Sequence, residues 1–205
     1  MRLVASGRVS EAPGGRAVWI VPYDDRWPQR AAAELQDLAR ALGSLVVYAD
    51  HIGSTAVPRM AAKDILDLQL SVRDLAVAAP AFDGPLARLG YQRRPFERDH
   101  VPAGETGDAS LWVKRLWARR AHPGGDVNLH VRLVGSPNER VALLFRDWLR
   151  AHRQAVAAYS GFKVALAAAV GDLEPYTEVK DPVVDLVVAA AGPWARAVGW
   201  QPHGS

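Results

Sequence analysis

Apolar and polar residues alternate over residues 65–72, and this pattern predicts a strand with two unlike faces. The polar positions of this strand are Asp67, Gln69 and Ser71. The same alternation over residues 127–134 predicts a second strand. Its polar positions are Asn128, His130 and Arg132. Because each set lies on the polar face of its strand, we expect both sets to line one polar side of a central sheet.

Helical patterns surround these strands. Apolar residues recur every three or four positions from Trp27 to Leu42, with a start signal at Asp24 and Pro28 and an end at Gly43. Further strands are predicted over residues 45–49 and 111–118, and further helices over residues 74–89, 138–151, 153–170 and 181–195. The expected core anchors of the helices from residue 138 to 170 are Phe145, Trp148, Leu149, Phe162 and Leu166. This order of elements is typical of α+β or α/β folds, and we predict an α+β fold: a mixed sheet covered by helices, with a helical C-terminal part.

The composition is that of a globular domain. Of the 205 residues 49% are apolar and 23% are charged, which excludes a disordered chain, because such a chain lacks the apolar content to offset its ordering entropy. No stretch approaches the roughly 20 apolar residues of a membrane span, and the first residues lack the apolar segment of a signal peptide. We therefore expect a cytoplasmic protein without membrane contact. We also expect a loose lead-in over residues 1–17, one domain over residues 18–198 and a tail over residues 199–205.

Basic residues are concentrated in one region of the chain. Between Leu111 and Arg132 there are five lysines and arginines and a single acid, Asp126. A local basic surface suits phosphate groups on a small molecule or on a nucleic acid, although a solvated strand face has the same appearance. We do not expect nucleic acid as the partner, because no stacking platform or known nucleic-acid motif accompanies the basic residues.

The segment from His51 to Pro58 is the first candidate for chemistry, because it follows a predicted strand and contains Gly53, Ser54 and Thr55. A glycine without a Cβ lets a phosphate approach the backbone, and the two hydroxyl residues offer donors to its oxygens. A turn with a capping serine is the alternative interpretation.

Asp67 is the second candidate. A Gly-Ser turn followed about a dozen residues later by an aspartate on a strand is the outline of the nucleotidyltransferase signature, in which strand carboxylates hold Mg²⁺. That signature has two acids at alternate positions, and here the second position holds the neutral Gln69. Asp64 lies three residues earlier and should face the other side of the strand.

His51 and His130 are the third candidate. With Asp67 they would form a polar cluster able to bind a metal or to act as an acid–base pair near pH 7. We expect all three side chains to face a common polar cavity. A purely structural role for a histidine in a strand is the alternative.

Several longer motifs together resemble a known family. They are Val21–Asp24, Arg26–Pro28, His51–Pro58, Ile65–Asp67, Leu89–Tyr91, Asn128–Val131, Phe145–Arg150, Tyr159 with Lys163, and Tyr176 and Thr177 with Lys180. On these motifs the chain resembles the GrpB family over residues 18–195. The resemblance implies a nucleotidyltransferase-like fold with a poorly defined activity. It departs from the family at Arg59 and Asp64, where the family normally has Gly and Pro.

The resemblance also implies a link to coenzyme A metabolism, because some relatives are fused behind dephospho-coenzyme A kinase. That kinase is therefore an expected partner by family analogy. This chain contains no kinase P-loop of the form G-x-x-x-x-G-K-[ST].

Two hypotheses of different classes follow. In the first the protein is a nucleotidyltransferase-like transferase acting on a nucleotide or another phosphorylated small molecule. The expected phosphate-binding residues are Gly53, Ser54, Thr55, Lys63, Arg115 and Arg132. The expected catalytic residues are His51, Asp67 and His130, which would also bind Mg²⁺ or another divalent metal.

In the second hypothesis the protein is a non-catalytic, degenerate nucleotidyltransferase domain that binds a ligand or assists a partner protein. The missing second carboxylate favours this hypothesis. The retained cluster of His51, Asp67 and His130 favours the first, because a purely structural domain would gain stability from apolar residues at those positions.

Overall fold

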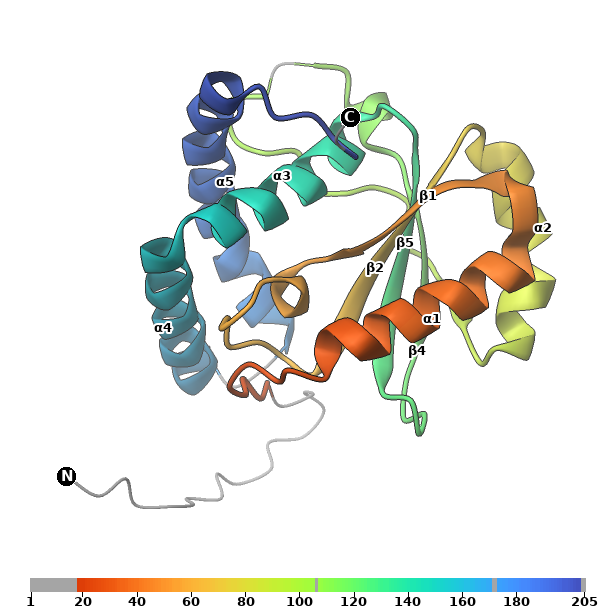
Figure 1. The fold of residues 1–205 in the computed structure, drawn as a ribbon, viewed down its shortest axis with the longest axis horizontal. Helices are drawn as coiled ribbons and strands as arrows, with labels where there is room; N and C mark the ends of the chain where they lie inside the picture. Colours follow the sequence, from red (N-terminus) through yellow and green to blue (C-terminus); the bar gives the residue numbers. More distant parts are fainter. Residues whose placement is uncertain (1–17, 106, 171–172, 204–205) are drawn as a thin grey trace.

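A mixed sheet forms the centre of the protein in the computed structural model, which describes residues 18–105, 107–170 and 173–203 (Figure 1). The strand order is β1-β2-β5-β4-β3. Strands β2 and β5 are parallel, and the other neighbouring pairs are antiparallel. The strands are β1 (Val46–Ile52), β2 (Ile65–Val72), β3 (Gln92–Arg94), β4 (Arg115–Arg119) and β5 (Asp126–Leu133). The mixed sheet confirms the predicted α+β class.

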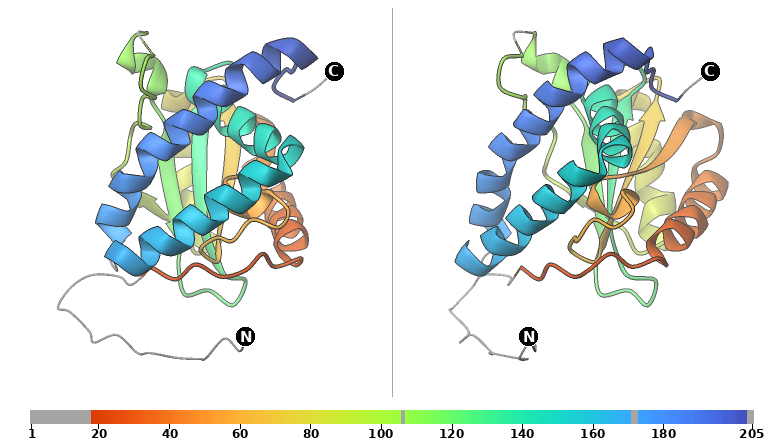
Figure 2. Two further views of the ribbon diagram at one scale, coloured as in Figure 1. Left: turned by 90° about the vertical axis from the view of Figure 1, so that its left-hand side faces the viewer. Right: turned by 60° about the vertical axis from the view of Figure 1, so that its left-hand side comes forward.

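Helices cover both faces of this sheet. Helices α1 and α2 pack on one face, and α3, α4 and α5 lie across the other, as the two views of Figure 2 show. The helices are α1 (Trp27–Leu42), α2 (Leu75–Arg88), α3 (Pro137–Ala151), α4 (Arg153–Val170) and α5 (Leu173–Val198). Among the described helices, none is both long and apolar enough to cross a membrane.

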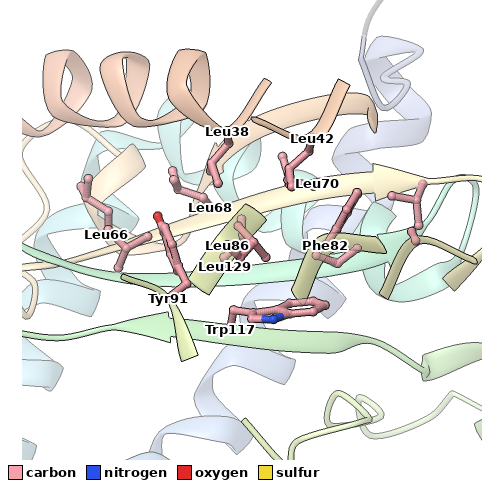
Figure 3. Packing of buried hydrophobic residues seen from close by; sticks show 14 of the residues in the cluster. Leu38, Leu42, Leu66, Leu68, Leu70, Phe82, Leu86, Tyr91, Trp117 and Leu129 are labelled. Carbon is pink, nitrogen blue, oxygen red and sulfur yellow. The ribbon is translucent and has the colours of Figure 1, made fainter. Parts of the chain in front are cut away.

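The apolar faces of β2 and β5 form the main core with α1 and α2 (Figure 3). Leu68 and Leu70 of β2 are fully buried beneath Leu38 of α1 and Phe82 of α2. Burying one leucine side chain contributes about 1.5–3 kcal/mol to stability, so the several buried leucines of this face make a large contribution to the folding free energy. The predicted alternation is confirmed on both strands, because the apolar positions are buried on this side and the polar positions face the other.

Helix starts follow the sequence signals with one exception. Asp24 does not cap α1. Its carboxylate accepts a hydrogen bond from the backbone N of Arg26 at 2.9 Å and forms an ion pair with the guanidinium of Arg26. Arg26 occupies the cap position without a side-chain bond to the helix. The side chains of Asp74 and Ser136 do accept backbone N–H bonds at the starts of α2 and α3.

The segment over residues 109–119 departs from the prediction of one strand over residues 111–118. A short 3₁₀ helix (Ala109–Trp112) comes first, and β4 begins only at Arg115. The cause is local: the side chain of Asp108 accepts a hydrogen bond from the backbone N of Ser110 and favours a turn there. Strand β1 also extends to Ile52, beyond the predicted end at residue 49.

The C-terminal helices bury the predicted anchors. Phe145, Leu149 and Leu166 are buried, and Trp148 and Phe162 are partly buried against the same clusters. Residues 199–203 pack back onto the domain, where the ring of His203 stacks on Tyr48 at 3.8 Å between centroids. Residues 1–17, for which a loose lead-in is predicted, lie outside the described residues.

Candidate functional site

A cavity of about 450 Å³ lies between the polar face of the sheet and helices α3, α4 and α5. Its volume is within the range of about 300–1,000 Å³ that is typical of small-molecule sites. The sheet contributes Asp67 from β2 and Asn128, His130 and Arg132 from β5. The turn after β1 contributes Gly53, Ser54 and Thr55, and the helices contribute apolar and basic side chains. The polar sets predicted from the two strands therefore do line one side of the sheet.

The turn after β1 depends on the absence of a side chain at Gly53. This residue has φ of +69°, and a Cβ atom there would lie 2.6 Å from Oδ2 of Asp67. A short 3₁₀ helix (Ser54–Ala56) follows directly. Glycine is thus required twice over, by the backbone conformation and by the carboxylate beside it. The Gly-Ser turn and the strand aspartate form one contiguous unit.

Asp67 is an ionised carboxylate at the cavity wall. Its Oδ1 accepts a hydrogen bond from Nδ2 of Asn128 at 2.8 Å and lies 3.7 Å from Nε2 of His130. Burial raises the pKa of Asp67, but the interactions with His130, Asn128 and Lys63 outweigh burial and hold the pKa well below its usual range. Its side chain is 31% exposed, so a ligand in the cavity can reach it.

His130 is a neutral donor in this arrangement. Burial lowers its pKa, and Arg132 and Lys114 lower it further against the opposing attraction of Asp67. Its Nδ1 lies 3.4 Å from Nη2 of Arg132, a group that can only donate, so Nδ1 is assigned as the acceptor. The proton of the neutral ring then resides on Nε2, which faces Asp67.

Arg132 lines the cavity, but its guanidinium is held by other side chains and shares one carboxylate with Lys114. Its Nε donates to Oδ2 of Asp99 at 2.8 Å, and its Nη1 donates to Oε1 of Gln69 at 2.5 Å. Lys114 donates to the same Asp99 at 2.6 Å. Gln69, which stands where the nucleotidyltransferase signature has its second acid, is therefore committed to holding Arg132.

Lysines from three segments of the chain also converge on the cavity. The chain has four lysines, and Lys63, Lys163 and Lys180 line this one cavity. Lys114 is the fourth and pairs with Asp99, whereas within the described residues no carboxylate forms an ion pair with the other three. Asp67, Asp181 and Asp185 also line the cavity, and Asp67 attracts Lys63 and Lys163 from a distance, so the positive charge of the three lysines is offset only in part.

Lys163 is the most buried of the three. Its Nζ donates to Oγ of Ser54 at 3.0 Å and lies 4.9 Å from the ring centroid of Tyr159, and the residue is only 2% exposed. Burial and the nearby Lys180 lower its pKa to about 7, although Asp67 acts in the other direction. Lys163 therefore changes its charge near neutral pH.

Lys63 precedes β2 and joins Lys163 from the side of the sheet. Its Nζ lies 5.3 Å from the ring centroid of Tyr176 on α5. Burial lowers its pKa, and repulsion from Lys180 adds to the effect. The predicted phosphate-binding residue Lys63 is thus at the cavity, together with Gly53 and Ser54.

His51 lies outside this arrangement. It is opposite Leu68 in the antiparallel pair, so its side chain belongs to the sheet face covered by α1 and α2. Its Nε2 lies 2.9 Å from Oγ1 of Thr55, and burial lowers its pKa to about 4. The expectation of one cavity shared with Asp67 and His130 is therefore not met by His51, because the neighbouring Ile52 is the residue opposite Asp67.

Arg115 is also absent from the cavity. It is opposite Val131 of β5, which places it on the other face of the sheet, and it lines a shallow depression there with Arg73 and Leu133. Its Nη1 donates to the carbonyl oxygen of Lys114 at 2.8 Å. The predicted phosphate-binding role of Arg115 at this site is wrong on geometric grounds. Thr55 does line the cavity, but its hydroxyl is bonded to His51.

The groups around Asp67 do not fit the predicted divalent metal. One carboxylate is present, its nearest neighbours are the donor Nδ2 of Asn128 and the Nε2 of His130, and cationic Lys63 is close by. Within the described residues, no group of three or more His, Asp or Glu side chains is arranged to hold a metal ion. Mg²⁺ prefers several oxygen ligands, so we derive no step through a metal here.

The sequence model of a family described as GrpB protein matches residues 17–190. The chain belongs to the GrpB family. This finding confirms the resemblance carried by the His51–Pro58 segment and the other motifs.

Longer curated proteins are similar in sequence to this chain. A dephospho-CoA kinase from Mycolicibacterium paratuberculosis is 37% identical over 97% of this chain and 51% of its own length. UPF0157 protein YqkA from Bacillus subtilis is 31% identical over 88% of this chain and 49% of its own length. The chain thus spans about half the length of these curated relatives.

A solved relative confirms the fold. The crystal structure of conserved protein GrpB from Enterococcus faecalis superimposes with a TM-score of 0.68 at 25% identity, covering 84% of this chain and 96% of that one. The predicted nucleotidyltransferase-like α+β fold is therefore shared with a GrpB structure.

Lys163 and Lys180 are site residues that the sequence patterns did not assign. Both belong to the motifs of the GrpB resemblance, but helix periodicity alone does not say which wall of the molecule they face. One signal in the sequence could have singled them out. Only four of the 25 Lys and Arg residues are lysines, so a lysine is rare in this chain.

Proposed function

We propose that this GrpB-family protein binds a phosphorylated small molecule in the cavity between the sheet and α3–α5. The observation that carries the proposal is the convergence of Lys63, Lys163 and Lys180 on one cavity. Asp67, Asp181 and Asp185 line it too, but within the described part of the chain none of the three lysines forms an ion pair with a carboxylate. Buried or half-buried cations without counter-ions are costly unless a ligand supplies the opposite charge.

The rest of the cavity supports a polar organic ligand. Ser54 places a hydroxyl beside the lysines, and Gly53 lets a ligand approach the backbone of the turn. The ionised Asp67 offers an acceptor for a ligand hydroxyl or amine, since its side chain is 31% exposed at the cavity wall. Phe145 adds apolar surface from α3.

A coenzyme A-related ligand is the first class to examine. Support comes from relatives named dephospho-CoA kinase, which match over 97% of this chain. The match covers only half of those proteins, so the name directs the choice of ligands and does not transfer their activity.

Metal-dependent nucleotidyl transfer is the second candidate. The Gly53 turn in contact with Asp67 favours it, because that pair is the phosphate- and metal-holding half of the nucleotidyltransferase signature. The commitment of Gln69 to Arg132 counts against it, since the second carboxylate is missing. A binding module without catalysis is consistent with both observations.

A ligand screen tests the proposal. Thermal shift and calorimetry would be measured with nucleoside triphosphates, coenzyme A, dephospho-coenzyme A and phosphopantetheine, each with and without Mg²⁺ or Mn²⁺. We expect a phosphorylated ligand to stabilise the protein, and Lys180→Met to weaken its binding about ten- to a hundredfold, the effect of losing one charge-assisted contact.

The control variant is Arg73→Met, an exposed cation on the other side of the sheet that should leave binding unchanged. No heat and no thermal shift at millimolar concentration of every phosphorylated ligand would overturn the proposal. Binding that strictly requires a metal would favour nucleotidyl transfer.

A further inference from the structure

The three cavity lysines stand out against the rest of the chain. Surface cations in this protein are almost all arginines, and arginine is the side chain that binds phosphate with a rigid, permanently charged fork. Lysine differs in being compact and in losing its charge readily when buried. Three of the four lysines line this cavity, together with Arg120 and Arg132, and the lysines allow the charge of the site to change with its occupant.

Lys163 has the surroundings for such a change. Ser54 is its hydrogen-bond partner, the ring of Tyr159 lies against it from its own helix, and the nearest carboxylate influence is Asp67. Lys63 from the sheet side and Lys180 from α5 repel a proton on Lys163. Asp181 and Asp185 of α5 line the same cavity, and Asp185 is paired with His100.

These groups together favour a neutral Lys163 in the absence of a ligand above about pH 7, because burial and two neighbouring ammonium groups oppose its charge. An anion placed among the three Nζ atoms favours the protonated form of Lys163 instead. It attracts the ammonium group of Lys163 and offsets the repulsion from the ammonium groups of Lys63 and Lys180. The more negative the anion, the larger this effect.

We propose that Ser54, Lys63, Lys163 and Lys180 form a subsite for the doubly charged terminal phosphate of a phosphomonoester, and that Lys163 takes up a proton when this phosphate binds. The inference rests on the proposed function and specifies it further: the ligand carries a monoester phosphate rather than only a phosphodiester or pyrophosphate bridge. Above about pH 7 Lys163 carries a positive charge only in the complex, so affinity decreases as the pH rises through this range.

Nuclear magnetic resonance of the lysine side chains tests the proton uptake directly. The chain has four lysines, so the Cε signals are few and can be assigned with single Lys→Met variants. Inorganic sulfate is the probe, because it stays doubly charged across the measured pH range, whereas phosphate itself titrates near pH 7. The titration of Lys163 would be followed from pH 5 to 10 with and without saturating sulfate.

We expect saturating sulfate to move the titration midpoint of Lys163 upward by at least one pH unit, and that of Lys114, which is paired with Asp99, to stay in place. Sulfate affinity should then decrease about tenfold per pH unit while free Lys163 is neutral, as required for uptake of one proton. A Lys163 midpoint that stays fixed while sulfate demonstrably binds would overturn the inference and leave the proposed function standing.

Two further comparisons make the outcome specific. Methyl phosphate should bind at least tenfold more tightly than dimethyl phosphate, and equal binding of the two would contradict the preference for a monoester. In Lys163→Met the sulfate affinity should lose its pH dependence near neutral pH. Lys180→Met should bind sulfate more weakly and keep the dependence, with its onset moved to higher pH because a charge that lowers the pKa of Lys163 has been removed. Absence of binding for sulfate and methyl phosphate alike would reject the subsite, and the ligand screen would still decide the proposed function.

Discussion

Gly53 and Asp67 lie so close together that a Cβ atom at position 53 would be 2.6 Å from Oδ2 of Asp67. The turn that presents Ser54 to the cavity and the carboxylate at the cavity wall are thus held in one geometry. A substitution at either residue should therefore displace the other.

Gly53→Ala should destabilise the protein more than a glycine substitution with backbone strain alone. Gly135 is the matched control, because it also has positive φ, at +77°, but open space around the position of a Cβ. We expect Gly135→Ala to cost about 1–2 kcal/mol, from its positive φ, and Gly53→Ala at least about 1 kcal/mol more. The added loss comes from the collision with Asp67 and from a ψ of −165°, which at positive φ is a region adopted almost only by glycine. Chemical denaturation measures both, and equal losses would contradict the account.

Phe145→Ala should cost about 3–5 kcal/mol of unfolding free energy. The ring is buried between α3 and α4, where its centroid lies 5.8 Å from that of Tyr159 in an edge-on contact. Leu111→Ala is a suitable control, because that side chain is exposed and its removal should change stability by less than about 0.5 kcal/mol. A loss below about 1 kcal/mol for Phe145→Ala would show that the helical layer is peripheral.

Lys163→Met should stabilise the unliganded protein relative to wild type, most strongly at low pH. The pKa of Lys163 is about 7 in the folded state and 10.5 for a free lysine, so between these values the unfolded chain binds more protons and wild-type stability rises with pH. The advantage of the variant should therefore shrink as the pH rises from 7 to about 10. A stability difference that is constant over this range, measured by urea denaturation, would contradict the assignment.

His51 should contribute to the loss of folding stability at acidic pH. Its pKa is lowered from 6.5 to about 4 by burial, so the unfolded chain takes up a proton that the folded protein excludes, and stability falls as the pH drops from about 6.5 to 4. In His51→Gln this part of the loss should disappear, while the polar partner of Thr55 is retained. Parallel pH profiles for wild type and variant would count against a buried, neutral His51.

The polar face of the sheet could be predicted from sequence because strand alternation is strict. Asp67, His130 and Arg132 face the cavity as the pattern required, since β2 and β5 pair in register. His51 was misplaced because nothing in its own segment fixes the register, and a one-residue shift moves a side chain to the other face. An irregularity between Val46 and Tyr48 adds to that uncertainty at the start of β1.

The convergence of the lysines on the cavity could not be predicted by local patterns. Lys163 meets Ser54 across a separation of 109 residues, and only the packing of α4 over the turn creates the contact. Arg132 illustrates the reverse case. Its charge suggested a phosphate ligand, but its guanidinium is bound to Asp99, which belongs to a loop without a clear sequence pattern and also pairs with Lys114. Long-range pairing decides which cations are available, and the sequence of one element does not contain that information.

Calorimetric titration with matched pairs of phosphorylated and dephosphorylated ligands tests the central claim most directly. The ligands would be those that stabilise the protein in the thermal screen, titrated into wild type, Lys180→Met and the control Arg73→Met. The account predicts that removing the phosphate or replacing Lys180 weakens binding about ten- to a hundredfold, while Arg73→Met binds as wild type does. Equal affinity for the phosphorylated and dephosphorylated members of each pair, or no binding of any phosphorylated ligand at millimolar concentration, would contradict it.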